Sequence, residues 1–275
     1  MGGLIALIIM NEMFRSILKL AEELKGVIKE GLNDREEAGE IVGKGASGED
    51  TKAIDRLAED FIVDSLREFR LHIVTEEAGV IKSSSTPEKI AVIDPLDGTF
   101  NALHNLPFYS FSIALAKYSE NATMEDINFG FVMDLVTGEY FHAERGEGSF
   151  FMGNKINVRD IPLDKGTLSL YSPPGSTKKL IPLLENTRRL RIMGSAALDL
   201  CYIARGDLQA FVDIRNFLRN VDTAAGLLIL EEAGGKISDL RGRTLRNSIL
   251  NIEKFNLVAA SPDVHNQVLH LLNMA

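Results

Sequence analysis

Cysteine is almost absent from this sequence, which has a single one, Cys201, among 275 residues. One cysteine cannot form an internal disulfide, and Cys201 has no partner in a Cys-x-x-Cys pair. Neither a disulfide-stabilised fold nor a cysteine-based metal site is therefore expected. This usage suits a reducing compartment, so we expect a cytoplasmic protein.

Long basic runs are absent as well. Thirty Lys and Arg stand against thirty-nine Asp and Glu, which gives a net charge of -9. Because an acidic surface repels phosphate backbones, we do not expect a nucleic acid partner. The sequence has no G-x-G-x-x-G fingerprint of a dinucleotide site, and its five histidines show no metal-ligand spacing.

No hydrophobic run is long enough to cross a bilayer, which takes about 20 residues. The opening "LIALIIM" has only seven apolar residues and no basic residue before it, unlike a signal peptide. We interpret it as a strand-like extension or a start assigned too early, with Met10 and Met13 as alternatives. No membrane partner is expected.

Hydrophobic periodicity predicts two halves. Residues 14–32 and 54–69 have the spacing of amphipathic helices, with Asp50 or Thr51 capping the second, and a glycine-rich polar stretch, "VGKGASGED", lies between them. Strand-like runs then dominate to about residue 152, and strands alternate with helices after Ile161. We expect an α+β fold with an N-terminal α+β domain over residues 1–160, built on an antiparallel sheet. An α/β domain with a mixed sheet follows over residues 161–275.

Acids follow several predicted strands. Glu76 comes after "LHIVT", Asp94 and Asp97 after "IAVI", and Asp222 opens a helical segment. Two carboxylates 4 Å apart repel by about 4 kcal/mol at an effective dielectric near 20, so a cluster of them stays ionised only around cations. Oxygen ligands favour Mg²⁺ or Mn²⁺. The alternative, that each acid caps a turn or a helix, stays open.

Two other functions also stay open. A haloacid dehalogenase phosphatase uses a nucleophilic Asp in a DxDxT pattern, whereas here two residues separate Asp94 from Asp97. A protein that binds metal or phosphate without catalysis could use the same acids.

Three segments together resemble the inositol monophosphatase family: "TEEAG", "AVIDPLDGTFN" and "VDTAAGLLILEEAGG". This family is a branch of the lithium-sensitive, metal-dependent phosphatases that includes fructose-1,6-bisphosphatases, and the resemblance covers nearly the whole chain. It implies a layered αβαβα sandwich and hydrolysis of phosphate monoesters. The arginines near Asp222 make the chain similar to archaeal members that act on both inositol 1-phosphate and fructose 1,6-bisphosphate. Family members are commonly dimers or tetramers.

The resemblance also implies roles for individual residues. Two or three Mg²⁺ ions would be held by Glu76, Asp94, the Leu96 carbonyl, Asp97 and Asp222. Thr99, paired with Asp55 and helped by Glu76, would orient and deprotonate a metal-activated water for in-line attack, while the backbone N–H groups of Gly98 and Thr99 would bind phosphate. The substrate-binding set would be Asp97, Gly194, Ser195, Ala196, Asp213, Arg215 and Arg219. Asp213 stands where many members have Glu, and the two arginines are suited to a second phosphate.

Overall fold

The structure, a computed structural model, describes residues 2–274, without the side chains of residues 2–11 and Thr177. The chain opens with one long helix, α1 (Gly2–Gly31), so the prediction of a strand-like N-terminal extension is wrong. No proline or turn separates the apolar run from the amphipathic pattern that follows, so the helix continues through both. None of the described helices is long and apolar enough to cross a membrane.

A large sheet occupies the first half. Its order is β10-β9-β8-β7-β6-β5-β3-β4, and its pairs are antiparallel except for β3 and β5, which are parallel. The strands are β3 (Leu71–Thr75), β4 (Gly79–Lys82), β5 (Lys89–Asp97), β6 (Ser110–Lys117), β7 (Ile127–Asp134), β8 (Tyr140–Glu144), β9 (Gly148–Phe151) and β10 (Asn154–Ile156). Sequence patterns did not reveal β4 and β10, which are short.

A smaller mixed sheet occupies the second half, in the order β12-β11-β13-β15-β14. Its strands are β11 (Thr167–Tyr171), β12 (Arg189–Arg191), β13 (Ala210–Arg219), β14 (Lys236–Ser238) and β15 (Lys254–Ala260). Within the described residues, the large sheet ends at Ile156 and the small sheet begins at Thr167. That the halves are separate domains stays a prediction.

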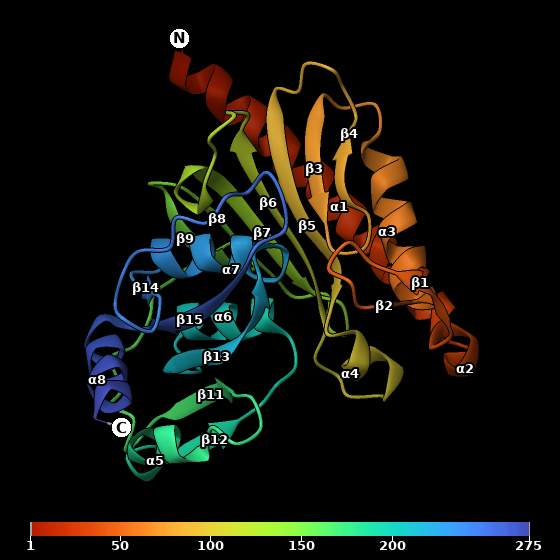
Figure 1. Cartoon of the computed structure of the whole chain (residues 1–275). Coiled ribbons are helices and arrows are strands. Elements are labelled where there is room, and N and C mark those ends of the chain that lie inside the picture. Colours follow the sequence, from red (N-terminus) through yellow and green to blue (C-terminus); the bar gives the residue numbers. More distant parts are fainter. Residues whose placement is uncertain (1, 275) are drawn as a thin grey trace.

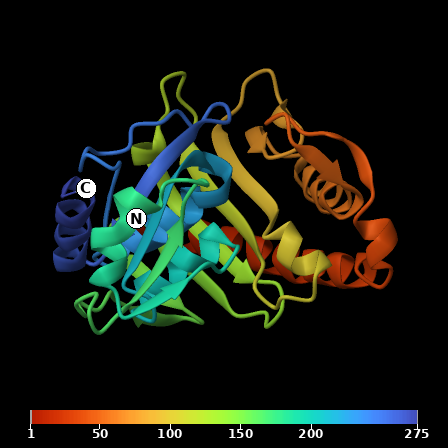
Figure 2. The ribbon, with the colours of Figure 1, turned by 60° about the horizontal axis from the view of Figure 1, so that its bottom comes forward.

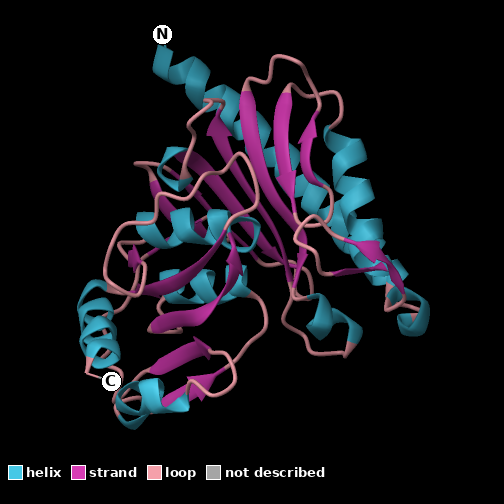
Figure 3. Ribbon diagram, viewed as in Figure 1, coloured by secondary structure: helices cyan, strands magenta, loops and turns pink. Residues whose placement is uncertain are grey.

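Helices and sheets alternate in layers (Figures 1 and 3). Helices α1 and α3 (Ala53–Leu66) pack on one face of the large sheet, while α6 (Ala196–Arg205) and α7 (Asn220–Glu232) lie between the two sheets. Helices α5 (Thr177–Glu185) and α8 (Pro262–Asn273) cover the small sheet. Figure 2 shows α1 (red) crossing behind β5 (yellow). The αβαβα prediction is confirmed.

The glycine-rich stretch differs from its prediction. It forms a hairpin of β1 (Ile41–Lys44) and β2 (Asp50–Lys52), and α3 begins only at Ala53. Neither Asp50 nor Thr51 is the cap. The N-cap is Lys52, whose backbone N–H donates to Asp55 Oδ2 at 3.1 Å. Short helices α2 (Arg35–Ala38) and α4 (Thr99–Leu103) and a 3₁₀ turn (Met124–Asp126) complete the chain.

Candidate active site

Acids from three elements meet at one end of the large sheet. The parallel register of β3 and β5 pairs Thr75 with Ile93, so the next residues, Glu76 just after β3 and Asp94 within β5, lie side by side. Asp222 lies in the first turn of α7, which packs against β5. One carboxylate oxygen from each of these three acids lies within 4.8 Å of the other two. The fold therefore gathers acids that are far apart in the sequence.

Asp94 is the most deeply buried of these acids. Its Oδ1 accepts the Leu96 N–H at 3.0 Å, but its buried Oδ2 has no hydrogen-bond partner. Burial, followed by repulsion from Glu76, Asp97 and Asp222, holds the pKa of Asp94 well above its ordinary value. Burial also raises the pKa of Glu76, to about 8. A buried oxygen without a donor, facing other carboxylates, suits a divalent cation with oxygen ligands.

Arg219 supplies positive charge to the same cluster. Its side chain, at the end of β13, is 10% exposed; Nη2 lies 2.9 Å from Asp222 Oδ1, and Nη1 donates to Glu76 Oε1. Burial opposes the charged guanidinium, but Asp222 and Glu76 outweigh this effect and raise the pKa of Arg219. Arg219 was predicted from the resemblance as a phosphate ligand. The structure places it in ion pairs with two of the acids, so phosphate binding stays a prediction.

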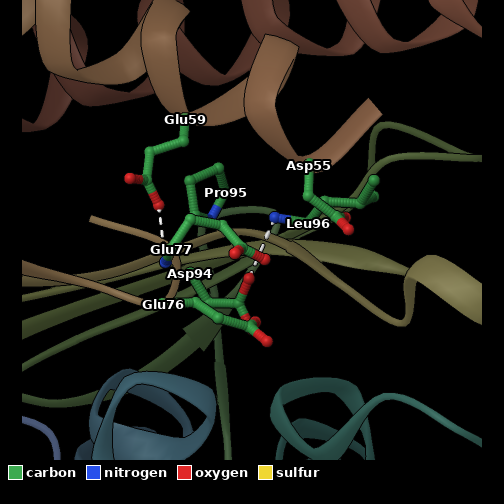
Figure 4. A pocket seen from close by; sticks show the side chains of 7 residues that line it. All are labelled: Asp55, Glu59, Glu76, Glu77, Asp94, Pro95 and Leu96. Atoms are coloured by element: carbon green, nitrogen blue, oxygen red, sulfur yellow. Dashed lines mark hydrogen bonds between the residues drawn. The ribbon is translucent and has the colours of Figure 1, made fainter. Parts of the chain in front are cut away.

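Asp55 and Thr99 meet beside the acids. The Thr99 hydroxyl donates to Asp55 Oδ1 at 2.6 Å and also lies 3.2 Å from the Leu96 carbonyl oxygen. Burial raises the pKa of Asp55 to about 6, although the hydrogen bond from Thr99 opposes this rise. Asp55 and Leu96 line a small pocket of about 10 Å³ together with Glu76 and Asp94. Figure 4 shows these side chains.

Glu59 is a further residue of this pocket that the sequence reasoning missed. Its carboxylate accepts the N–H of Glu77 at 2.9 Å and that of Ala78 at 2.6 Å, so it fixes the turn that presents Glu76 (Figure 4). The available signal was its position four residues after Asp55. An acid at that spacing lies on the same face of the helix, next to the buried Ala58.

Asp97 connects the two halves of the site. Its Oδ2 accepts the Ser195 hydroxyl at 2.6 Å and the Ala197 N–H at 2.8 Å, which ties β5 to the start of α6. Burial, with repulsion from Asp222, raises the pKa of Asp97 to about 7. Gly98 follows with φ +99°, and a Cβ there would come 3.1 Å from the Gly194 carbonyl oxygen. Only glycine fits this close approach.

A cavity of about 310 Å³ opens beside the acids. Its predicted site residues are Glu76, Asp94, Leu96, Asp97, Gly98, Thr99, Gly194, Ala196, Arg215, Arg219 and Asp222, and Phe100, Tyr171 and Phe217 are among its other walls. Ser195 and Asp213, both fully buried, are not part of this lining. Asp213 instead holds Arg215, with Nη2 and Oδ2 2.6 Å apart, and the Arg215 guanidinium lies 4.7 Å from the centre of the Tyr171 ring.

A layered αβαβα sandwich with clustered acids beside a cavity defines the sugar phosphatase class of fold. The inositol monophosphatase family model matches residues 10–273, and the chain belongs to this family. It is 36% identical to a fructose-1,6-bisphosphatase/inositol-1-monophosphatase of Archaeoglobus fulgidus, over 94% of this chain and 98% of that protein. It is 37% identical to the protein of that name from Methanothermobacter thermautotrophicus, over 94% and 95% of the two chains.

A solved structure supports the same family assignment. A crystal structure of an inositol monophosphatase-fructose 1,6 bisphosphatase superposes with a TM-score of 0.80 at 30% identity, covering 94% of this chain and 98% of the other.

Proposed function

We propose that this protein is a Mg²⁺-dependent phosphatase that hydrolyses inositol 1-phosphate, fructose 1,6-bisphosphate or both. The observation that carries this proposal is the buried Asp94: its Oδ2 has no hydrogen-bond donor, and one of its carboxylate oxygens lies within 4.8 Å of oxygens of Glu76 and Asp222. The names of the archaeal relatives support the two substrates. A homo-oligomer, a dimer or a tetramer, in the cytoplasm is part of the same proposal.

The metal ligands would be the carboxylates of Glu76, Asp94, Asp97 and Asp222 and the carbonyl of Leu96. All are oxygen donors, as Mg²⁺ prefers, and Mn²⁺ would fit the same set. Bound there, the ions supply positive charge that offsets the charge of the phosphoryl group and lowers the pKa of water. Hydrolysis of phosphate monoesters takes an acceleration of up to about 10²¹-fold, whereas a positioned acid or base gives only about 10²- to 10⁴-fold. The charge of the ions would therefore supply most of the catalysis.

Thr99 and Asp55 would handle the proton of the attacking water. As the Thr99 hydroxyl accepts that proton, it passes its own along the 2.6 Å hydrogen bond to Asp55 Oδ1. The pKa of Asp55, raised to about 6 by burial, suits a proton acceptor near neutral pH. Glu76 would orient the same water, and Glu59 keeps Glu76 in place through the turn that follows it.

The remaining cavity residues would bind the substrate. The backbone N–H groups of Gly98 and Thr99 would hold the phosphoryl group, with Gly194 and Ala196 beside the polyol ring. Arg215, oriented by Asp213, would bind the second phosphate of a bisphosphate. Asp97, Ser195, Asp213 and Arg219 stay in the proposed substrate-binding set. Ser195 and Asp213 would contribute from behind the cavity wall, through their hydrogen bonds to Asp97 and Arg215.

Phosphate release tests the proposal. Purified protein with Mg²⁺ should liberate phosphate from inositol 1-phosphate or fructose 1,6-bisphosphate, and EDTA should stop the reaction. No release from either ester in the presence of Mg²⁺ would leave a non-catalytic binding protein. Borohydride trapping of a phosphorylated Asp94 would instead identify a haloacid dehalogenase mechanism.

A further inference from the structure

A second, open cavity of about 670 Å³ is lined by the loop between β14 and β15 and by the start of β15. It contains four cationic residues, Arg241, Arg243, Arg246 and Lys254, which we call the arginine pocket. Among the described residues that line it, Asp239 is the one acid. In a protein with a net charge of -9, this is a strong local reversal of sign.

The cations of the arginine pocket are only partly neutralised. Asp239 is taken by Arg243, with Nη2 and Oδ2 2.6 Å apart. Arg246 lies 3.6 Å from Glu125, and its side chain is 77% exposed, so this ion pair is weak. No ion pair within residues 2–274 involves Arg241. The Lys254 ammonium lies 3.6 Å from Glu49 Oε1, so Arg241 and the weakly paired Arg246 carry the positive charge that is open to an anion.

The arginine pocket adjoins the catalytic cavity. The Lys254 ammonium lies 4.5 Å from the centre of the Phe217 ring, and Phe217 lines the catalytic cavity. In the β13–β15 register Lys254 lies opposite Arg219, which also lines the catalytic cavity, so both side chains leave the same face of the sheet. Phe217 and Lys254 thus form a wall between the two cavities.

The rest of the lining suits a small organic anion. Leu245 and Phe255 give the pocket an apolar floor. The Asn256 side chain, which is part of the lining, accepts the Asn216 N–H through its Oδ1 at 2.7 Å. This hydrogen bond fixes the orientation of the Asn256 amide group. Guanidinium groups above an apolar floor bind phosphate oxygens by paired hydrogen bonds while the floor contacts the carbon skeleton.

We propose that the arginine pocket binds a small molecule with at least two phosphate charges. Either this molecule is a substrate that places one phosphate in the catalytic cavity and its distal part in the arginine pocket, or it is a separate ligand. The binding itself is independent of the proposed phosphatase activity, and only the substrate case depends on it.

Calorimetric titration with tripolyphosphate in EDTA tests the binding, because without metal the clustered acids repel anions from the catalytic cavity. Wild type should bind, and the double variant R241Q/R246Q should bind at least tenfold more weakly. Both arginines are exposed, so the fold should be retained. R15Q/R67Q makes the same charge change at exposed positions on α1 and just after α3, and should bind within about twofold of wild type. Equal weakening in both double variants, or no binding by wild type, would overturn the proposal.

Steady-state kinetics with Mg²⁺ separates the two sources of the ligand. A KM that rises in R241Q/R246Q for fructose 1,6-bisphosphate and not for inositol 1-phosphate assigns the second phosphate of the substrate to the pocket in place of Arg215. Unchanged KM values with lost tripolyphosphate binding assign it to a separate ligand. Absence of turnover with both esters in wild type would refute the proposed function, while the titration in EDTA would still decide on the pocket.

Discussion

Replacing Asp94 with Asn should make the metal-free protein more stable while removing its function. At 4.8 Å, two unit charges repel by about 3.5 kcal/mol at an effective dielectric near 20, and Asp94 lies within this distance of both Glu76 and Asp222. Proton uptake relieves part of this repulsion, since burial raises the pKa of both Asp94 and Glu76. We therefore expect a gain of about 1 to 3 kcal/mol in the free energy of unfolding. Asn can still accept the Leu96 N–H, so this hydrogen bond is kept.

Denaturant unfolding at pH 9 is the assay, run in EDTA and again with excess Mg²⁺. At pH 9 Glu76, with a pKa of about 8, is mostly charged. Wild type should gain about 2.7 kcal/mol when Mg²⁺ is at a hundred times its Kd, whereas Asp94→Asn should gain almost nothing. Phosphatase turnover should be abolished, because Asp94 is one of the proposed metal ligands.

Asp60→Asn is the matched control, since Asp60 is an exposed acid on α3. It should change stability by less than about 0.5 kcal/mol and keep the Mg²⁺ effect. The reasoning is refuted if Asp94→Asn lowers stability in EDTA, keeps the wild-type gain with Mg²⁺, or turns over within tenfold of wild type.

Three further predictions concern the arginines and a buried acid. Arg215→Ala should raise the KM for fructose 1,6-bisphosphate more than that for inositol 1-phosphate in steady-state assays, and equal effects would remove Arg215 from the second-phosphate role. Arg219→Met should lower the melting temperature in EDTA, because the acids lose their internal cation. It should also tighten Mg²⁺ binding in calorimetry, because the metal no longer competes with the guanidinium. Equal losses of melting temperature with and without Mg²⁺ would indicate an effect on packing alone. Asp199, buried beside Tyr171, has its pKa raised to about 8 by burial, so its contribution to stability is full below about pH 4 and is lost as pH rises through 8. Asp199→Asn should therefore gain stability relative to wild type across that window in urea unfolding, and a constant difference between the two proteins would count against this pKa.

The sequence indicated the acid cluster because neighbouring strands bring acids at the same end of the sheet together, as Glu76 after β3 and Asp94 near the end of β5 show. Two contacts at the site could not be predicted in this way. An arginine at a strand end can point to either face, so only the packed structure shows that Arg219 binds Glu76 and Asp222. The resemblance implies that Asp213 is a substrate ligand, yet its carboxylate is buried and accepts a hydrogen bond from Arg215.

The larger architecture was predictable because hydrophobic periodicity is strong in long buried elements. Prediction from periodicity failed in segments that are short or apolar on every side. The run "LIALIIM" has no polar residue to distinguish a helix from a strand, and its helical state follows from continuity with the rest of α1. The strands β1 and β2 lie in a polar, glycine-rich segment with no alternating pattern.

Anomalous diffraction from crystals soaked in Mn²⁺ tests the central claim most directly. Strong peaks between the carboxylates of Glu76, Asp94 and Asp222 are predicted, with loss of those peaks in Asp94→Asn crystals. Wild-type crystals that show no peak among these three acids, with the carboxylates still facing one another, would contradict the account.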